Sequence, residues 1–466
     1  MPEPIAAVIA ANRFGLGARP GELALIGTDA RGWLRAQLRG PPEVIAAAEL
    51  RSSAQILAQA LELRHEVQLQ RKVATSSGAA DEPAAQRLPQ LLRPIYSAEV
   101  SARLRQAVSS TRPFIERLTQ FWTNHFAISI EKHFLAGLAG SFEREAIRPH
   151  VLGSFHDMLL AAEMHPAMQL YLDNYLSVGP HSSMAERRVR REARRLGINE
   201  NLAREILELH TLGVGGGYTQ QDVTTFAQVL TGWSIGGEGP RFGGGEPGRF
   251  VFRPELHEPG AKVVLGRRYA DEGFGQGAAV LRDLAHERAT ARFIATKLAR
   301  HFIADEPPPQ AVVRLADVFA RSGGDLPSLY GALIDEREAW LEPLAKYKTP
   351  ADYVVSSFRG LEVAIETDRS ALAPFEVLGQ RTWQPGSPAG WPDRSADWDG
   401  AAALMKRIQW ADAVGARLGS HRDVLQLAPQ WLGGNLTAAT RQAVAHASSA
   451  AQALTLLLAA PEFMRR

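Results

Sequence analysis

The sequence contains no cysteine among its 466 residues. Disulfide bonds, thiolate metal ligands and cysteine nucleophiles are therefore excluded, and only histidines and carboxylates are left as plausible metal ligands. A chain without cysteine is compatible with reducing and oxidising compartments alike, so this absence does not assign a location.

Long apolar runs are also missing. No window reaches the roughly 18 uninterrupted apolar residues that a transmembrane helix needs. The first residues, MPEPIAAVIAANRFGLGARP, do not combine a basic start with a long apolar run, and they contain no twin-arginine motif. We therefore expect a soluble protein without a membrane span, which on the sequence alone is cytoplasmic.

Neither sign of charge dominates. Lys and Arg total 52 against 50 for Asp and Glu, which gives a formal net charge of +2. This balance gives no reason to expect nucleic acid as a partner. The arginines do cluster in residues 185–197, where a solvated charge run is favoured over an anion contact.

Several catalytic signatures are absent. We find no H-E-x-x-H and no E-x-x-H within residues 199–213. The glycines after residue 236 are not followed by G-K-[ST], the ending of a phosphate-binding loop. We expect no defined metal site, and the sequence does not identify a cofactor.

Helical periodicity dominates the chain and predicts a mainly α protein, folded as one large helical domain over residues 1–466. In RPFIERLTQFWTNHFAIS, Pro113 stands at a predicted helix start, and one face carries Phe114, Leu118, Phe121 and Trp122 together with His125. A second predicted boundary lies at His165–Pro166, because a residue before proline avoids the helical region.

Three segments interrupt this pattern. Residues 74–88 are small and polar and predict a mobile loop. Residues 236–269 are rich in Gly and Pro, and they predict an ordered loop with a small β-hairpin built on Phe250, Phe252, Val263 and Leu265. A Trp/Pro/Gly segment at 380–400 precedes the last helices.

The stretch NENLAREILELHTLGVGGGYT, residues 199–219, carries the densest set of polar side chains. An N-cap at Asn199 and a left-handed C-cap at Gly213 predict a helix from about 200 to 212. Its predicted core face carries Leu202, Ile206 and Leu209. The opposite face carries Glu200, Asn201, Arg204, Glu205 and Glu208. On spacing alone this polar face is a solvated network of i,i+4 ion pairs, and a capping box at Thr219 and Asp222 opens the next helix.

Four further residues could take part in chemistry. His125 lies on an apolar helix face, where a buried structural histidine is favoured over a ligand, and Asn124 beside it could cap or orient. His257 and Lys262 flank a Pro-Gly turn in HEPGAK. They could present a base and a cation to an anionic group, because loops on a rigid scaffold tend to carry function, although a loop anchor is equally plausible.

Pieces along nearly the whole chain resemble the bacterial domain-of-unknown-function family 1800. They are NRFGLGARPGEL, FWTNHFAIS, HPAMQLYLDNYLS, the stretch at 199–223 with LTGW, FRPELHEPGAK, HERATARFIATKLARHFIADEPP and GWPD, and they follow the order of the family. The resemblance implies a mostly helical fold without a settled activity. It also implies a sulfatase- or phosphatase-like partner, encoded nearby and commonly exported by the twin-arginine route, so the chain would be periplasmic if the two are exported together.

The resemblance also bears on individual residues. In many members of the family an aromatic residue stands where this chain has His210, which argues against an obligatory catalytic role for that histidine. The polar residues at 199–208 match the motif in full, which raises a buried polar pocket to the same standing as a structural network.

Two hypotheses of different classes follow. In the first, the protein is a hydrolase or lyase of envelope or polymeric material. Its catalytic groups would be Glu205, Glu208, His125 and His257, and its substrate-binding groups Asn199, Asn201, Arg204, Lys262 and Asn124. In the second, it is a non-catalytic partner or scaffold for the sulfatase- or phosphatase-like protein. An acidic pair that lines a deep pocket with the histidines would favour the first hypothesis. A broad exposed apolar patch, with those acids locked in ion pairs, would favour the second.

Overall fold

The computed structural model describes residues 5–466, except 46, 48, 78–83, 133, 191–196, 238–243 and 342–343; of residues 68–86 and 188–190 only the backbone is described where it is helical. Twenty-two α-helices and two small antiparallel sheets make up the described ranges, so the expectation of a mainly α protein is confirmed. No helix in these ranges is long and apolar enough to cross a membrane.

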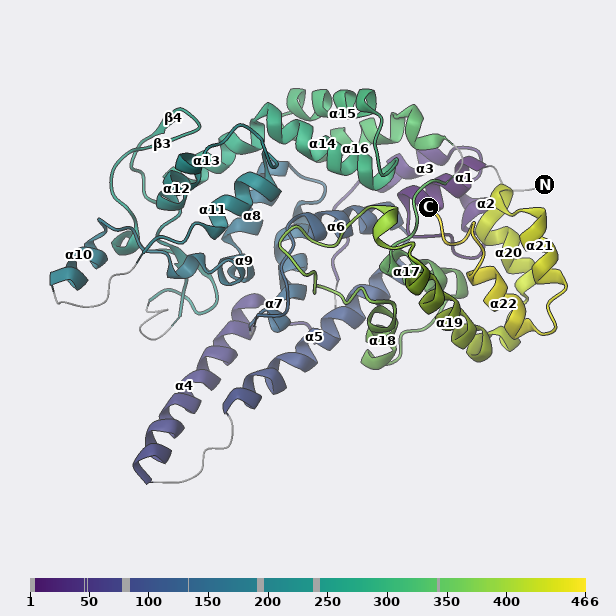
Figure 1. Cartoon of the computed structure of the whole chain (residues 1–466), viewed down its shortest axis with the longest axis horizontal. Coiled ribbons are helices and arrows are strands. Elements are labelled where there is room, and N and C mark those ends of the chain that lie inside the picture. Colours follow the sequence, from purple (N-terminus) through teal and green to yellow (C-terminus); the bar gives the residue numbers. More distant parts are fainter. Residues whose placement is uncertain are drawn as a thin grey trace.

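The α-helices follow one another along the chain with these bounds: α1 Ile5–Ile9, α2 Glu22–Ile26, α3 Ala30–Gln37, α4 Ser53–Ser77, α5 Ala84–Ser109, α6 Pro113–His125, α7 Leu135–Phe142, α8 Phe155–Met164, α9 Pro166–Tyr171, α10 Ser183–Arg190, α11 Asn201–Glu205, α12 Gln220–Val229, α13 Phe274–His286, α14 Arg288–Phe302, α15 Pro309–Arg321, α16 Leu326–Asp335, α17 Pro350–Leu361, α18 Asp368–Leu378, α19 Ala401–Leu418, α20 Val424–Leu432, α21 Ala438–Ala445 and α22 Ala450–Leu458. Figure 1 shows α13–α16 along one side of the molecule, α19–α22 at one end near α1 and α2, and α4 and α5 extending away from the body.

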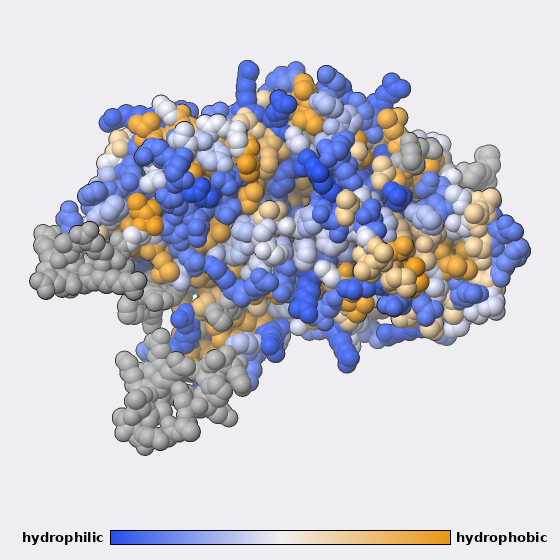
Figure 2. Space-filling view, in the orientation of Figure 1, coloured by the Kyte–Doolittle hydropathy of each residue, from blue (hydrophilic) through white to orange (hydrophobic). Residues whose placement is uncertain are grey.

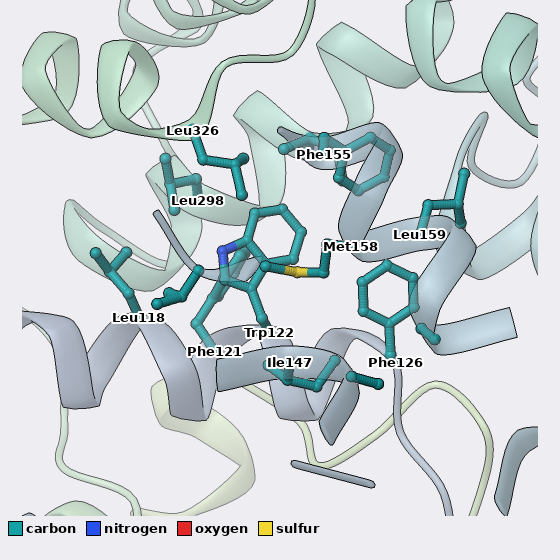
Figure 3. Packing of buried hydrophobic residues seen from close by; sticks show 14 of the residues in the cluster. Leu118, Phe121, Trp122, Phe126, Ile147, Phe155, Met158, Leu159, Leu298 and Leu326 are labelled. Atoms are coloured by element: carbon teal, nitrogen blue, oxygen red, sulfur yellow. The ribbon is translucent and has the colours of Figure 1, made fainter. Parts of the chain in front are cut away.

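The larger of two hydrophobic clusters is centred on α6. Trp122 is fully buried among Leu118, Phe155, Met158 and Leu298, as Figure 3 shows. Its indole nitrogen donates to the hydroxyl of Tyr330 at 2.6 Å, so the polar atom of this core side chain is satisfied. The predicted apolar face of α6 is confirmed, and its helix begins at Pro113 as expected.

The second cluster joins α17 to the C-terminal helices through Tyr353, Trp410, Trp431 and Phe463. Arg359 on α17 connects the two clusters. Its buried guanidinium donates to backbone carbonyls of α5 and of the loop before α2, and to the Glu22 carboxylate at 3.1 Å. A buried cation with this many acceptors orients α17 against the N-terminal helices.

The interrupted segments differ from expectation in part. Helices α4 and α5 extend into both ends of the expected loop at 74–88, and residues 78–83 lie outside the described ones, as do 191–196 of the arginine cluster. Residues 380–400 contain only the short 3-10 turn Ser395–Asp397 and precede α19, as predicted. The predicted break at His165–Pro166 is confirmed, because the His165 ring accepts from the Ala167 amide and opens α9.

The expected small β-hairpin is present, but the pairing expected from Phe250, Phe252, Val263 and Leu265 is wrong. Strand β2 (Phe250–Phe252) pairs instead with β1 (Trp233–Ile235), and β3 (Lys262–Val264) pairs with β4 (Arg267–Tyr269). Phe250 packs against Trp233 at a ring separation of 5.3 Å, so the strand that pairs with β2 lies before the glycine-rich residues rather than after them. Leu265 has a φ of 52° and forms the turn between β3 and β4.

Candidate functional site

A cavity of about 350 Å³ opens between α6, α14, α17 and the segment at 380–400. Its volume is at the lower end of the range typical of small-molecule sites. The wall is rich in charged and aromatic side chains, which come from parts of the sequence far apart: Arg103, Arg117, Phe121, Asn124, His125, Lys297, Arg300, His301, Asp352, Arg381, Trp383, Trp391, Asp393 and Arg394.

Asn124, at the end of α6, holds one side of this cavity in place. Its amide nitrogen donates to the Trp391 carbonyl at 2.9 Å, and its oxygen accepts from the Trp391 amide at 2.8 Å. This pair of bonds imitates a strand pairing and draws the segment at 380–400 across α6 (Figure 1). The predicted substrate-binding residue therefore positions a wall of the cavity, in the orienting role considered for it.

An aspartate–histidine pair lies in the wall. His301 Nδ1 is 3.0 Å from Asp393 Oδ2, and His301 Nε2 has no hydrogen-bond partner among the described residues. Burial lowers the pKa of His301 to about 4, although Asp393 opposes this shift. At neutral pH the imidazole is therefore neutral, with its proton on Nδ1 towards the carboxylate and a lone pair on Nε2.

Asp352 forms a second charged centre beside this pair. Arg117 and Arg466 approach its two oxygens at 2.9 and 2.8 Å, and all three side chains are buried. Burial alone would raise the pKa of Asp352, but the two guanidinium groups outweigh it and hold the pKa well below its usual range. Arg466 also reaches Asp393 at 3.3 Å, so one side chain connects both aspartates of the cavity wall.

Lys297 on α14 contributes an amine to the same wall. Its Nζ lies 5.5 Å from the centre of the Phe293 ring, and burial lowers the pKa of the amine to about 8. The charge on Lys297 adds to burial in lowering the pKa of His125 well below its usual value. His125 therefore stays neutral at physiological pH.

The stretch at 199–219 does not form the cavity wall but holds His125 of that wall in position. From Ile206 to His210 its helix widens into a π-helical turn, and the carbonyl of His210 accepts from His125 Nε2 at 3.1 Å. This bond fixes the tautomer of His125 and leaves its Nδ1 without a proton. His210 itself is buried and bonded to Glu163 at 2.7 Å, so its ring serves the core.

Gly213 ends this helix with a φ of 83°, as the predicted left-handed cap requires. A Cβ at Gly213 would lie 2.6 Å from Cδ2 of Phe293, the ring beside Lys297. We expect Gly213→Ala to destabilise the fold by about 1–3 kcal/mol through backbone strain. Displacement of the Phe293 ring should add a further loss of stability. Urea unfolding measures the difference.

The matched control is Gly215→Ala. Gly215 has a similar φ of 76°, but a Cβ there would meet nothing within 4 Å. This variant isolates the backbone strain, and the additional cost of Gly213→Ala measures the contact with Phe293. Equal losses from the two substitutions would contradict a supporting role of Gly213 behind the cavity.

The predicted acidic face forms a surface network. Arg204 lies 3.1 Å from Glu200 and 3.6 Å from Glu208, and these side chains are between 27% and 37% exposed. Glu200 also accepts from Thr224 at 2.7 Å and from Gln220 at 2.9 Å. None of the three lines the cavity.

The other residues of the stretch are mostly structural. Asn199 accepts from the Asn201 amide at 2.9 Å and donates to the Leu172 carbonyl at 3.0 Å, so it opens the helix as predicted, while the Asn201 side chain is exposed. Leu202 and Ile206 are buried, but Leu209 is only half-buried, which corrects its place in the predicted core. The π-helical turn rotates Leu207 inward instead.

Glu205 is half-buried at the edge of this network. Burial raises the pKa of its carboxyl, against the effect of His210. Among the described residues no hydrogen bond or ion pair joins it to His125 or His257. The predicted pocket joining Glu205, Glu208, His125 and His257 is therefore not assembled.

His257 and Lys262 act as loop anchors. His257 Nδ1 lies 2.9 Å from the Thr231 carbonyl, and the ring packs on Phe252. Lys262 donates to the carbonyls of Glu258, Pro259 and Gly260 at 2.7–3.1 Å, which closes the Pro-Gly turn. Both residues lie away from the cavity, and of the two interpretations of HEPGAK the anchor is the one that the contacts support.

Of the predicted catalytic and substrate-binding residues, only Asn124 and His125 line the cavity. Sequence reasoning missed Lys297, His301, Asp352 and Asp393. A signal was nevertheless present, since Lys297 and His301 lie in HERATARFIATKLARHFIADEPP and Asp393 ends GWPD. Within the described ranges, no three His, Asp or Glu side chains are grouped as metal ligands would be.

Comparison with known proteins identifies the family of the chain but no activity. No curated protein and no solved structure matches the chain. A family model described as a protein of unknown function, DUF1800, matches residues 9–465, nearly the whole chain. The resemblance noted in the sequence is thus confirmed, and the chain belongs to the DUF1800 family.

Proposed function

We propose that the protein is a hydrolase or lyase that works by general acid–base chemistry in the cavity between α6, α14 and α17. The observation that carries this proposal is the His301–Asp393 pair of the cavity wall, in which the carboxylate accepts from Nδ1 and Nε2 is buried without a hydrogen-bond partner among the described residues. A histidine held in this way by a carboxylate is oriented to take a proton from water or from a substrate.

The surroundings of His301 keep its imidazole neutral, so that the ring can accept a proton. Because its pKa is lowered to about 4, Nε2 carries no proton at neutral pH. A weakly basic histidine is a poor base as it stands, but a negative charge brought beside it raises its pKa towards the working range. Trp383 and Trp391 of the cavity wall add aromatic side chains for an organic or polymeric ligand, in keeping with envelope material as the substrate.

We expect His301→Gln to lower turnover at least 100-fold, because glutamine cannot accept a proton as imidazole does. Asp393→Asn should lower it too, because the amide no longer fixes the Nδ1 proton. The measurement is hydrolysis of p-nitrophenyl esters, sulfates, phosphates and glycosides, together with formation of unsaturated product from uronic-acid polymers.

The control is His286→Gln, which changes an exposed histidine outside the cavity. It should turn over every active substrate at the wild-type rate. If no substrate of the panel is turned over, or if His301→Gln is as active as the wild type, the proposal is wrong.

A second candidate function is the partner or scaffold role for a sulfatase- or phosphatase-like protein, in the periplasm if the two are exported together. Its support is the pair α4 and α5, which extends from the body as a long arm (Figure 1). The exposed apolar side chains, among them Leu25, Val44 and Val214, are scattered, and Figure 2 shows separate apolar patches among hydrophilic residues. Co-purification of the tagged chain from its host tests this role, and recovery of the chain alone would contradict it.

A further inference from the structure

Most charged side chains of the cavity wall are paired with other groups of the protein. Each arginine of the wall has an acceptor in the described part of the chain: Arg103 with Glu143 at 2.7 Å, Arg117 with Asp352 at 2.9 Å, Arg300 with the Asp305 carbonyl at 3.2 Å, Arg381 with Glu376 at 3.8 Å and Arg394 with Glu306 at 3.0 Å. These contacts engage the arginines with the protein itself.

The nearby carboxylates are used in the same way. Asp352 forms ion pairs with Arg117 and Arg466, and Asp393 is approached by His301, Lys346 and Arg466 at 3.0–3.7 Å. Asp397 at the rim is exposed to solvent. Neither buried aspartate makes a hydrogen bond or an ion pair with Lys297 among the described contacts.

Lys297 is the exception among the cations of the wall. Within the described residues its amine has no hydrogen-bond acceptor and no carboxylate within ion-pair distance, and it lies 5.5 Å from the centre of the Phe293 ring. The charge of Asp393 favours this ammonium group only from beyond ion-pair distance, and burial outweighs it, so an anion supplied from outside would lower the cost of holding the charge in a partly enclosed space.

We propose that the cavity binds an oxyanion group of its ligand, a carboxylate, sulfate or phosphate, through the ammonium of Lys297. The inference rests on the proposed function for its place in catalysis, but the binding step stands on the geometry of Lys297 alone. An anion at this position lies in the same cavity as His301, where its charge raises the pKa of the imidazole and makes Nε2 a stronger base. The ligand is therefore an acidic compound, or a polymer unit that carries an acidic group.

The test measures binding of acetate, inorganic sulfate and inorganic phosphate to the whole protein by titration calorimetry, at constant ionic strength set with chloride. We expect at least one of the three anions to bind, and the preferred anion identifies the group. Lys297→Met should weaken that binding at least tenfold, whereas Lys406→Met, which removes an exposed lysine outside the cavity, should bind like the wild type.

A pH series with sulfate, whose charge is constant over the range, provides the second readout. Because the pKa of Lys297 is lowered to about 8, sulfate affinity in the wild type should fall between pH 7 and 9.5. Lys297→Arg, which stays charged throughout, should lose this pH dependence. Circular dichroism verifies that each variant is folded.

The proposal is overturned if none of the three anions binds, or if Lys297→Met binds them as the wild type does. His301→Gln separates it from the proposed function, because that variant should still bind the anion while losing turnover. Anion binding without any turnover would remove the proposed function alone. Turnover that is independent of Lys297, without anion binding, would remove this inference alone.

Discussion

Arg466→Met is expected to destabilise the folded protein by about 3–5 kcal/mol, because it leaves buried carboxylates with incomplete compensation. The Arg466 guanidinium is fully buried, 2.8 Å from Asp352 and 3.3 Å from Asp393. Without it, Asp352 keeps the Arg117 guanidinium and the Thr349 amide, and Asp393 keeps His301 and Lys346. Thermal and urea unfolding at pH 7 measure the loss.

The neighbouring residue offers a control. Arg465→Met removes an exposed arginine that donates only to the Ala345 carbonyl, and should change stability by less than about 1 kcal/mol. Similar losses from the two substitutions would show that the aspartates do not depend on Arg466.

The effect of Arg466→Met should also depend on pH. The folded pKa of Asp352 lies below its unfolded value of about 3.9, so its ionised form stabilises the wild type above pH 4 and this contribution is lost as the pH falls. Removing Arg466 reduces the depression of that pKa. The difference between wild type and variant should therefore be largest at neutral pH and should shrink below about pH 4.

Arg148→Met is the second substitution with a large expected effect, about 3–5 kcal/mol. Arg148 donates to both oxygens of Glu116 at 2.7 Å and to Glu143 at 3.1 Å, and all three side chains are buried. Glu143 in turn holds Arg103 of the cavity wall at 2.7 Å, so this network orients the wall as well as the core.

Two variants make the prediction for Arg148 specific. Arg148→Met combined with Glu116→Gln should recover part of the stability, because removing both charges costs less than leaving one buried charge unpaired. Arg204→Met breaks the exposed pairs with Glu200 and Glu208 and should cost about 0.2–1 kcal/mol. A loss from Arg148→Met no larger than that from Arg204→Met would contradict the account of the buried network.

Local sequence chemistry predicted much of the fold. Pro113, the Thr219–Asp222 capping box and Gly213 each mark a helix end, because caps and positive φ values are properties of a few neighbouring residues. The π-helical turn at residues 206–210 and the pairing of β1 with β2 could not be predicted in this way. Both depend on contacts with residues distant in the sequence, such as His125 and Phe250.

The candidate site shows the same limit more strongly. The density of polar residues at 199–208 drew attention to a surface network, whereas His301 and Asp393 stand 92 positions apart and come together only when the segment at 380–400 crosses α6. No spacing rule links such residues. The stretch at 199–219 contributes through its backbone and its glycine, which hold His125 and Phe293, and not through its acids.

Titration of the histidine side chains by NMR, with and without sulfate, tests the central claim most directly. We expect His301 to carry its proton on Nδ1, to titrate with a pKa of about 4, and to show a raised pKa and shifted Nε2 signal when sulfate is added. The signals of the exposed His286 should not change when sulfate is added. A proton on Nε2 at neutral pH, or His301 signals that ignore sulfate while the anion binds, would contradict a general base in an anion-binding cavity.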